Sequence, residues 1–343
     1  MTNTEQLLQL RGLLAAPSGN DDDPWQRVVL HRTDATPEIK FSRDDDFRAR
    51  LAGATPQTFS LESAGTYEIQ RPTATPATPL AGKIAIVTGA AGAIGAGICR
   101  GLLEKGCRVA ATDVSPDNLQ KLVADLQGVG EILGVPLDVT DPQSVAAGFA
   151  QVIAAWGGLD IVVVNAGIAI GAALLDTSLD AFRKLEKVNV DGALLTLTES
   201  GRVFKQQNTG GDIIVISTKN FFSPGAGFGA YCATKSACHQ LARIASLEFA
   251  PFGVRVNMVA PDAVFSEGGI RSGLWAEVGP ARMKSRGLDE KGLEEYYRNR
   301  NLLKARVTAT HVANAVLFFA TRQTPTTGAT IPVDGGLPDA SPR

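Results

Sequence analysis

Residues 83–95, KIAIVTGAAGAIG, decide the fold of this chain. Residues 83–88 are a run of β-branched and small apolar side chains, which is typical of a strand buried on both faces. The glycines that follow predict a tight turn into a helix, where unpaired backbone N–H groups and the positive end of the helix dipole can bind a pyrophosphate. The candidate contacts are Gly89, Gly92 and Gly95. A strand-to-helix turn without a ligand has the same local pattern.

Six further short apolar runs follow toward the C-terminus. They are RVAATDV (108–114), GVPLDVT (134–140), LDIVVVNAG (159–167), GDIIVIST (211–218), VRVNMVA (254–260) and ATIPVDGG (329–336). Helix-forming stretches separate them at 96–105, 116–127, 142–156, 179–207 and 231–250. Strands that are apolar throughout and alternate with helices indicate a parallel sheet with helices on both faces. The sequence therefore predicts an α/β fold, a Rossmann-like doubly wound parallel sheet.

Composition and charge exclude several classes of protein. The chain has 343 residues, 44% of them hydrophobic and 20% charged, so it can bury a large core. Its formal net charge of -2 argues against a nucleic acid or an anionic membrane as partner. No uncharged stretch reaches the roughly 18 to 20 apolar residues of a membrane span. Because the N-terminus lacks the pattern of a signal peptide, we expect a cytoplasmic protein.

Cysteine and histidine usage predicts neither a disulfide framework nor a metal site. The four cysteines have no CxxC spacing, and a chain of this length folds without disulfides. The three histidines are widely separated and outside the HExxH spacing of metal hydrolases.

The composition changes near residue 80. Residues 1–79 contain seven of the 18 prolines and two acidic triplets, at 21–23 and 44–46. An amphipathic period is limited to residues 4–14. We therefore expect residues 1–79 to be a poorly structured extension that ends in a Pro/Thr/Ala linker, followed by a single domain over 80–343. The same reasoning predicts that residues 1–75 can be removed without loss of the fold.

Asp113, at the end of the second strand of the domain, indicates the class of cofactor. It lies 24 residues after Gly89, close to the spacing of about 20 expected for an acid that accepts hydrogen bonds from the adenosine ribose. Its charge would repel a 2′-phosphate, and no Lys or Arg follows it in VSPD (114–117). These features predict NAD in preference to NADP.

Two more strand ends extend the expected cofactor site. Asp138 can accept a hydrogen bond from the adenine amino group, and Val139 can cover the adenine ring. Small residues at Asn165, Ala166 and Gly167 leave room for the ribose. Ligands of doubly wound sheets bind at the carboxyl ends of the strands, which is where these residues lie. Each is also compatible with an ordinary strand-ending turn.

Tyr231 and Lys235 form the candidate catalytic pair. They lie four residues apart in AYCATKSACHQ (230–240), so both occupy one face of a predicted helix. A tyrosine with a pKa of about 10 is a weak base, but a nearby ammonium and a positive nicotinamide would stabilise its phenolate. Thr218, thirteen residues before Tyr231 at the end of a strand, supplies a hydroxyl that can hold the substrate oxygen.

Residues 80–343 resemble the short-chain dehydrogenase/reductase family. The motifs that carry the resemblance are TGAAGAIG (88–95), Asp113, NAG (165–167), KVNVDGA (187–193), YCATK (231–235) and VRVNMVAPDAV (254–264), in that order. The resemblance implies that Tyr231 transfers a proton, that Lys235 binds the nicotinamide ribose and lowers the tyrosine pKa, and that Asn189 anchors a proton-relay water. It also implies hydride transfer between a substrate carbon and the nicotinamide. Further cofactor contacts are then expected at Ile94, Pro261, Val264 and Ser266.

Two residues depart from the family pattern. Ala93 stands where glycine is usual, and Thr218 stands where serine is usual, although Gly92 and Ser217 lie one residue earlier. Neither departure removes a chemical group that the reaction needs. Because adjacent strand residues face opposite ways, only one of the two hydroxyls can point at the nicotinamide, and the spacing to Tyr231 selects Thr218.

Four segments are similar to the dehydrogenase half of the bifunctional rhamnulose-1-phosphate aldolase/alcohol dehydrogenases. They are TGGDIIVISTKN (209–220), NMVAPDAVF (257–265), LEEYYRNRNLLK (293–304) and TGATIPVDGGLPDASPR (327–343). This similarity implies that the substrate is lactaldehyde or a related hydroxy-aldehyde or polyol. The aldolase half is absent, and residues 1–79 contain no histidine cluster for its metal.

The substrate end of the site is expected under a lid at residues 262–305. Lys219, Asn220 and Asp262 are candidate substrate contacts, since polar groups at the mouth of a site suit a hydroxylated substrate better than a fatty acyl chain. His239, in an apolar part of the helix that carries Tyr231, is interpreted as a packing residue rather than a base.

The leading hypothesis is thus an NAD-dependent alcohol dehydrogenase for a small polyol, hydroxy-aldehyde or sugar-derived alcohol. A 3-oxoacyl reductase would prefer NADPH, which Asp113 disfavours, and a non-catalytic NAD-binding scaffold would not need Tyr231, Lys235 and Asn189. The expected partners are a small-molecule substrate and further copies of the chain. The helices at 179–207 and 231–250 would pair across a two-fold axis, and the C-terminal tail would help to close a tetramer.

Overall fold

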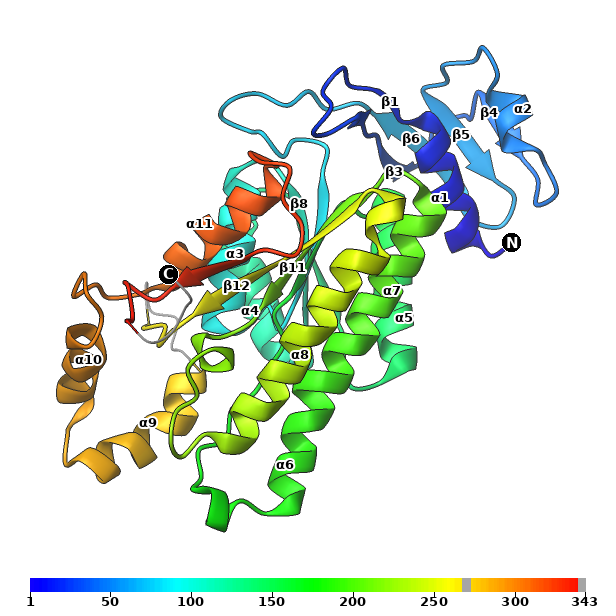
Figure 1. The fold of residues 1–343 in the computed structure, drawn as a ribbon. Helices are drawn as coiled ribbons and strands as arrows, with labels where there is room; N and C mark the ends of the chain where they lie inside the picture. The colour runs from blue at the N-terminus through cyan, green and yellow to red at the C-terminus, as the bar shows by residue number, and fades with distance from the viewer. Residues whose placement is uncertain (267–272, 339–343) are drawn as a thin grey trace.

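A parallel sheet forms the centre of the molecule. The computed structural model describes residues 1–266 and 273–338, and within them seven strands pair in parallel in the order β13-β12-β11-β10-β7-β8-β9 (Figure 1). The strands are β7 (Ile84–Thr88), β8 (Arg108–Asp113), β9 (Ile132–Pro136), β10 (Ile161–Val164), β11 (Gly211–Ile216), β12 (Val254–Pro261) and β13 (Thr330–Val333). The predicted Rossmann-like doubly wound sheet is confirmed.

Helices cover both faces of the sheet and bury two apolar cores. One core lies under α3 (Ala93–Glu104), α4 (Pro116–Leu126) and α11 (Ala309–Ala320). The other lies under α5 (Pro142–Trp156), α7 (Gly192–Gln207) and α8 (Gly229–Glu248). Successive residues of β7 alternate between them, with Ala85 and Val87 in the first core and Ile84 and Ile86 in the second. This two-sided burial explains why the strands are apolar throughout.

Two differences from the predicted bounds affect residues of the predicted site. The third strand of the domain, predicted over 134–140, is β9 and ends at Pro136, so Asp138 and Val139 lie in the loop that follows. The helix predicted over 179–207 is interrupted by a π-helical turn, η2 (Lys187–Asp191), between α6 (Leu179–Glu186) and α7. Such turns occur frequently at functional sites, and Asn189 lies at the centre of this one. The short 3-10 helices are η1 (Leu174–Asp176), η3 (Lys219–Phe221) and η4 (Ala250–Phe252).

Residues 1–79 differ from the expectation of a poorly structured extension. They form α1 (Asn3–Leu14), the short pair β1 (Ala16–Pro17) and β2 (Trp25–Gln26), and α2 (Phe47–Leu51). They also form a four-stranded sheet in the order β3-β6-β5-β4, made of β3 (Val29–Thr33), β4 (Ile39–Phe41), β5 (Thr58–Leu61) and β6 (Gly65–Gln70). We call residues 1–79 the N-terminal module. Its own small core contains Phe41, Phe47, Phe59 and Tyr67, each at most 2% exposed.

The N-terminal module also packs against helices that cover the parallel sheet. Helix α1 packs against α5 and α7, and its Leu7, Leu8 and Leu10 join the core beneath those helices. Gly12 permits the close approach, because a Cβ at this position would lie 2.1 Å from the carbonyl oxygen of Gln207. The module is therefore stabilised by apolar surface that lies far away in the sequence, which a local period cannot reveal.

Buried charges also fix the N-terminal module to the amino-terminal edge of the parallel sheet. Asp160, just before β10, is 1% exposed and accepts hydrogen bonds from Arg11 at 2.6 and 3.2 Å. Arg27 lies 2.9 Å from the same carboxylate, and the Ile84 amide donates to it at 2.9 Å. Asp23, in the first acidic triplet, pairs with Arg27 and with Lys83 and Arg322 of the following domain.

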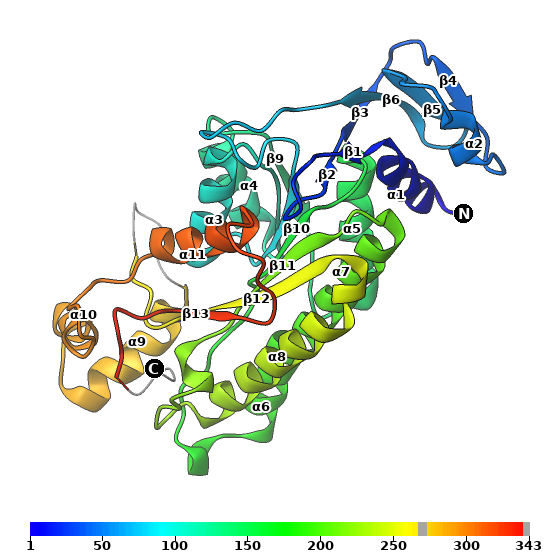
Figure 2. The same cartoon turned by 45° about the horizontal axis from the view of Figure 1, so that its top comes forward.

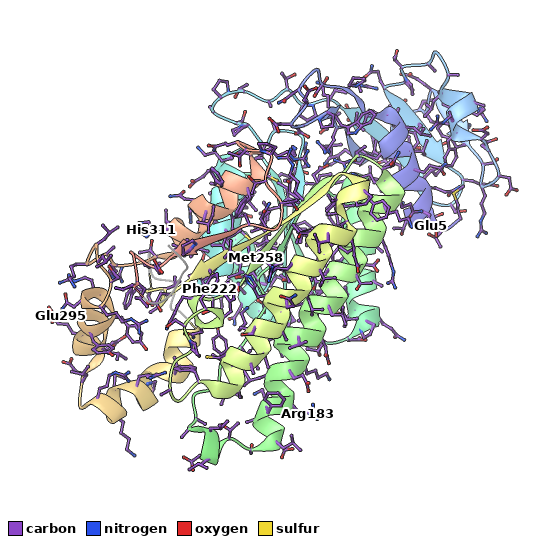
Figure 3. The ribbon with its side chains drawn as sticks, viewed as in Figure 1. Glu5, Arg183, Phe222, Met258, Glu295 and His311 are labelled. Atoms are coloured by element: carbon purple, nitrogen blue, oxygen red, sulfur yellow. The ribbon has the colours of Figure 1, made fainter. Side chains whose placement is uncertain are left out.

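The lid segment lies at the opposite end of the sheet. Helices α9 (Gly273–Arg286) and α10 (Glu290–Asn299) extend beyond the carboxyl ends of β11 and β12 (Figure 2). Figure 3 places Glu5 on the N-terminal module and Glu295 on α10, at opposite ends of the molecule. Residues 267–272 of the predicted lid lie outside the described residues.

Within 1–266 and 273–338, none of the helices combines the length and apolarity needed to cross a membrane. The four cysteines are all buried and free of disulfides. The same described ranges hold no group of three or more His, Cys, Asp or Glu side chains placed to ligate a metal ion.

Candidate active site

The glycine turn after β7 has the geometry of a phosphate cradle. Gly89 has φ +62°, and a Cβ there would lie 2.8 Å from the Cα of Ala166. A Cβ at Gly95 would lie 2.4 Å from the carbonyl oxygen of Gly89, so the first and last glycines are needed for packing. Gly92 is different, since it is exposed and a Cβ there would meet nothing closer than 3.5 Å. The open space at Gly92 lies where α3 begins.

The N-terminus of α3 fits a pyrophosphate. Its N-cap, Gly92, makes no side-chain capping hydrogen bond, so the first N–H groups of the helix receive no side-chain partner at the cap. Anions bind to such groups, because the helix dipole adds a partial positive charge. Ala93 is buried as the first residue of the helix, and Ile94 beside it is half-buried. The residues present therefore fit the dinucleotide that the sequence predicts.

Asn165 holds the glycine turn in place. Its side-chain amide donates to the carbonyl oxygens of Thr88 and Gly89, both at 2.9 Å. The backbone amides of Asn165 and Ala166 both donate to the Thr88 hydroxyl. The Asn165 side chain is thus engaged with protein, and its part in the site is to shape the turn. Thr88 was not among the predicted site residues. The available signal was that this residue is polar and stands at the end of an apolar strand.

Asp113 lies beside the same turn. Its Oδ2 accepts a hydrogen bond from the Ala91 amide at 3.1 Å, and its Oδ1 accepts one from the Ser115 amide at 3.0 Å. A carboxylate has about four acceptor positions, so two remain for the hydroxyls of a ribose. The half-buried carboxylate is therefore oriented before any ligand arrives.

The loop after β9 brings Asp138 and Val139 to the same edge of the sheet. Asp138 is half-buried, and its Oδ1 accepts a hydrogen bond from the Thr140 amide at 2.8 Å. Val139 is 7% exposed and packs tightly against α7, because a Cβ at Gly192 would lie 2.7 Å from its Cγ2. The structure thus gives Val139 a packing role beside its expected contact with adenine.

Tyr231 lies near the start of α8 and is 8% exposed. Burial raises the pKa of Tyr231 to about 12, while a hydrogen bond with the Thr218 side chain opposes the rise. Thr218 lies just beyond the end of β11 at Ile216, so its hydroxyl and that of Tyr231 lie near each other at the carboxyl end of this strand. A proton acceptor and a second hydroxyl placed in this way can together hold one alcohol oxygen of a substrate.

Asn189 and Lys235 both lie close to Gly167. A Cβ at Gly167 would lie 3.2 Å from Asn189 Oδ1 and 3.8 Å from Lys235 Nζ. Lys235 Nζ donates to the carbonyl oxygen of Ile216 at 2.7 Å.

The Asn189 side chain is held on both sides. It exchanges 2.9 Å hydrogen bonds with the backbone of Ile168 and donates to the Thr234 hydroxyl at 3.1 Å. Because the Thr234 hydroxyl in turn donates to the Tyr231 carbonyl, the π-helical turn is tied to the start of α8.

Ser217 and Thr218 follow β11 and approach different residues of α8. Ser217 Oγ lies 3.0 Å from His239 Nδ1. The His239 ring stacks on Phe221 with 3.5 Å between ring centroids, and burial lowers its pKa to about 4. The imidazole is therefore neutral at pH 7, which is consistent with a packing residue. The structure brings Thr218, and not Ser217, to the candidate base.

The polar residues predicted for the substrate end also come together. Lys219 is 8% exposed, and its Nζ donates to the carbonyl oxygen of Ser223 at 3.1 Å. Asp262 follows the end of β12 at Pro261 and pairs with Arg300, from the end of α10. Asn220 is half-buried, and its backbone amide donates a hydrogen bond to the Thr218 hydroxyl. Arg300 was not among the predicted site residues, because no motif or hydrophobic period distinguishes it from its neighbours.

Val264 and Ser266 follow β12 in the segment that leads to the lid. Val264 is 5% exposed and packs in the core under α3 and α11. Ser266 is half-buried, and its carbonyl oxygen accepts a hydrogen bond from Arg306 at 2.7 Å. Both lie on the same side of the sheet as the glycine turn.

Comparisons with known proteins show the family of the chain. A family model described as short chain dehydrogenase matches residues 83–273. The uncharacterized oxidoreductase YuxG of Bacillus subtilis is 35% identical over 274 residues, which are 79% of this chain and 39% of that protein. The chain thus spans about two fifths of the length of this relative. The 2,5-dichloro-2,5-cyclohexadiene-1,4-diol dehydrogenase LinX of Sphingobium indicum is 30% identical over 76% of this chain and 98% of its own.

A solved structure has the same fold. The crystal structure of a short-chain type dehydrogenase/reductase from Mycobacterium marinum superposes with a TM-score of 0.67 at 28% identity and covers 76% of this chain and 96% of its own. The glycine turn, Asp113 and the Tyr231 site all lie within the matched residues 83–273. This chain belongs to the short-chain dehydrogenase/reductase family.

Proposed function

We propose that the protein is an NAD-dependent dehydrogenase that interconverts a hydroxyl and a carbonyl group on a small hydroxylated compound. The observation that carries the proposal is the placement of Asn189 Oδ1 and Lys235 Nζ beside Gly167, near the carboxyl end of β11. The buried Tyr231 lies four residues before Lys235 on α8, and the Thr218 side chain acts to lower its pKa. Asp113 at the glycine turn supports NAD over NADP, because its charge disfavours a 2′-phosphate.

The proposed chemistry assigns one task to each residue. Bound NAD supplies the carbon that accepts a hydride from the substrate carbon. Thr218 donates a hydrogen bond to the substrate oxygen, and Tyr231 accepts the hydroxyl proton as the carbonyl forms. The Lys235 ammonium stabilises the phenolate that this transfer requires. Asn189, held by Ile168, keeps the π-helical turn in place for a water that relays the proton onward.

A small polyol, hydroxy-aldehyde or sugar-derived alcohol is the proposed class of substrate. Lys219 and Asp262 are charged and largely buried, so covering them with a fatty acyl chain would cost free energy, whereas a polar molecule could form hydrogen bonds with them. The similarity of residues 209–220 and 293–304 to rhamnulose-1-phosphate aldolase/alcohol dehydrogenases points to the same class. The name of the LinX relative, a diol dehydrogenase, also supports it.

The test is a panel of polyols, hydroxy-aldehydes and sugars mixed with the protein and NAD, with NADH absorbance as the readout. We expect NADH to form from NAD with at least one small hydroxylated compound, and NADPH to form more slowly when NADP replaces NAD. Absence of turnover across the panel, in the presence of tight NAD binding, would instead favour a non-catalytic scaffold.

Replacing Asp113 by Ser is expected to exchange the cofactor preference. The change removes the acceptor for the ribose hydroxyls and the repulsion of a 2′-phosphate, so the Kd for NAD should rise about tenfold to hundredfold while that for NADP falls. Titration of both cofactors into the two proteins measures this. A native protein that binds NADP more tightly than NAD would contradict the assignment.

Thr218→Ala is expected to cost about 2 to 4 kcal/mol of transition-state stabilisation, measured from kcat/KM. The lost hydrogen bond strengthens as charge develops on the substrate oxygen. Ser217→Ala is the matched control, because its hydroxyl faces His239. Thr218→Ser should stay active. If Ser217→Ala lost turnover while Thr218→Ala kept it, the assignment of the substrate hydrogen bond to Thr218 would be wrong.

We also propose that the protein assembles in the cytoplasm as a dimer or tetramer through α7 and α8. Leu194 on α7 and Ile244 and Leu247 on α8 are exposed apolar side chains. Their burial against a second copy across a two-fold axis would remove this surface from water. Free, buried cysteines suit a reducing compartment.

A further inference from the structure

The substrate end of the site has a cluster of positive charge. Lys219 and Arg300 flank the carboxylate of Asp262, which receives Arg300 Nη2 at 2.5 Å on both oxygens. Arg282 of α9 lies near Lys219 and Arg300. The charge of Arg282 helps to lower the pKa of Lys219, and the charge of Arg300 helps to lower the pKa of Arg282. We call Lys219, Arg282 and Arg300 the cationic cluster. Its three members come from three separate elements of the fold.

The cationic cluster adjoins the candidate base from two directions. Lys219 directly follows Thr218, whose side chain is hydrogen-bonded with Tyr231. On the other side, the guanidinium of Arg282 stands 4.1 Å from the centroid of the Phe228 ring, and that ring lies 6.0 Å from the ring of Tyr231. A molecule with its reacting oxygen at Tyr231 would therefore extend toward the cluster.

The positive charge is incompletely neutralised by the described residues. Among residues 1–266 and 273–338, Asp262 is the one carboxylate that forms an ion pair with Arg300. Lys219 forms no ion pair with a carboxylate in these ranges. Burial lowers the pKa of Lys219, and Asp262 opposes this while Arg300 adds to it. One carboxylate thus serves a buried cation, Lys219, and a half-buried one, Arg300, an arrangement that costs free energy without a second anion.

Hydrogen-bond donors in the cluster are also left over. Lys219 Nζ has three donors and uses one for the Ser223 carbonyl oxygen. Arg300 Nε is buried and has no hydrogen-bond partner. Neutral hydroxyls of a polyol could accept from these donors but would leave the charge uncompensated. A carboxylate or phosphate would satisfy both.

We propose that the substrate carries an oxyanion, either a carboxylate or a phosphate monoester, and that Lys219 and Arg300 bind it while the reacting hydroxyl lies at Thr218 and Tyr231. This inference rests on the proposed function for the position of the reacting hydroxyl. It narrows the substrate from hydroxylated compounds in general to those with an anionic group a few carbons away from the reacting carbon. Asp262 then orients Arg300 and competes with the bound anion.

Calorimetric titration of the NAD-saturated protein tests the inference without requiring turnover. The probes are ribitol, ribonate and ribitol 5-phosphate, which differ in one terminal group. We expect one of the two charged probes to bind at least about tenfold more tightly than ribitol, as a charge-assisted hydrogen bond allows. The better of the two identifies carboxylate or phosphate as the anion.

Variants locate the effect. Lys219→Met should weaken binding of the charged probe about tenfold and binding of ribitol much less, whereas Asp262→Asn should strengthen binding of the charged probe by removing the competing carboxylate. Arg298→Met is the matched control, because Arg298 is an exposed arginine of α10 that pairs with Glu295. Urea unfolding of each variant checks that the fold persists.

Two results would overturn the inference: equal affinity for ribitol and both charged probes, or equal losses in Lys219→Met and Arg298→Met. Failure of the proposed function looks different. In that case the charged probe still binds and still depends on Lys219, but no NADH forms from any member of the substrate panel.

Discussion

Tyr231→Phe is expected to lower kcat for alcohol oxidation by about 10²- to 10⁴-fold, the range that a positioned general base contributes. The variant keeps the ring that packs against Phe228 and removes only the hydroxyl that takes the substrate proton. NAD affinity should change little, because the glycine turn and Asp113 are untouched. Steady-state kinetics with the best compound of the panel, together with NAD titration, measures both quantities.

The pH profile separates a base from a structural tyrosine. Burial raises the pKa of Tyr231 to about 12, and the active form for oxidation is the phenolate, so the oxidation rate should rise with pH through the alkaline range. The charges of Lys235 and bound nicotinamide move this rise to lower pH. Carbonyl reduction uses the protonated form and should fall over the same range. A Tyr231→Phe enzyme that kept the full rate, or the same pH-dependent rise, would show that another group is the base.

Removal of residues 1–79 is expected to prevent stable folding or to lower the free energy of unfolding by well over 3 kcal/mol. Deletion strips both guanidinium partners from Asp160, and leaving a buried charge unpaired costs about 3 to 5 kcal/mol by itself. It also exposes the surface of α5 and α7 on which Leu7, Leu8 and Leu10 pack, at about 1.5 to 3 kcal/mol for each fully buried side chain. The structure thus reverses the expectation that residues 1–75 are dispensable.

A point variant isolates the ionic part of this effect. Arg11→Met should lower the free energy of unfolding, measured by urea denaturation, by about 1.5 to 3 kcal/mol, because Arg27 stays 2.9 Å from Asp160 and only the hydrogen bonds of Arg11 are lost. Arg48→Met is the control, since Arg48 is exposed on α2 within the same module and should change stability by less than about 0.5 kcal/mol. A soluble truncated chain with the stability of the full chain would contradict the shared core.

The amino-acid sequence alone predicted the architecture of the dehydrogenase domain and most of its site. Apolar runs such as Ile84–Thr88 reveal burial on both faces, and Gly95 needs to be glycine because a Cβ there would meet the backbone of Gly89 and Ala90, a few residues earlier. Tyr231 and Lys235 share a helix face through their spacing alone. These features arise from local periods and local turn geometry, which a sequence displays directly.

Tertiary structure decided the features that depend on distant partners. Arg11 and Asp160 are 149 residues apart, and Arg300 and Asp262 are 38 apart, so neither pairing follows from a period or a motif. The N-terminal module was expected to be poorly structured because the partners of many of its residues lie far away in the sequence. Apolar residues of α1 pack against α5 and α7, and Asp23 of the first acidic triplet pairs with Lys83 and Arg322. Burial and charge neutralisation depend on which surfaces meet when the chain folds, whereas composition records only which residues are present.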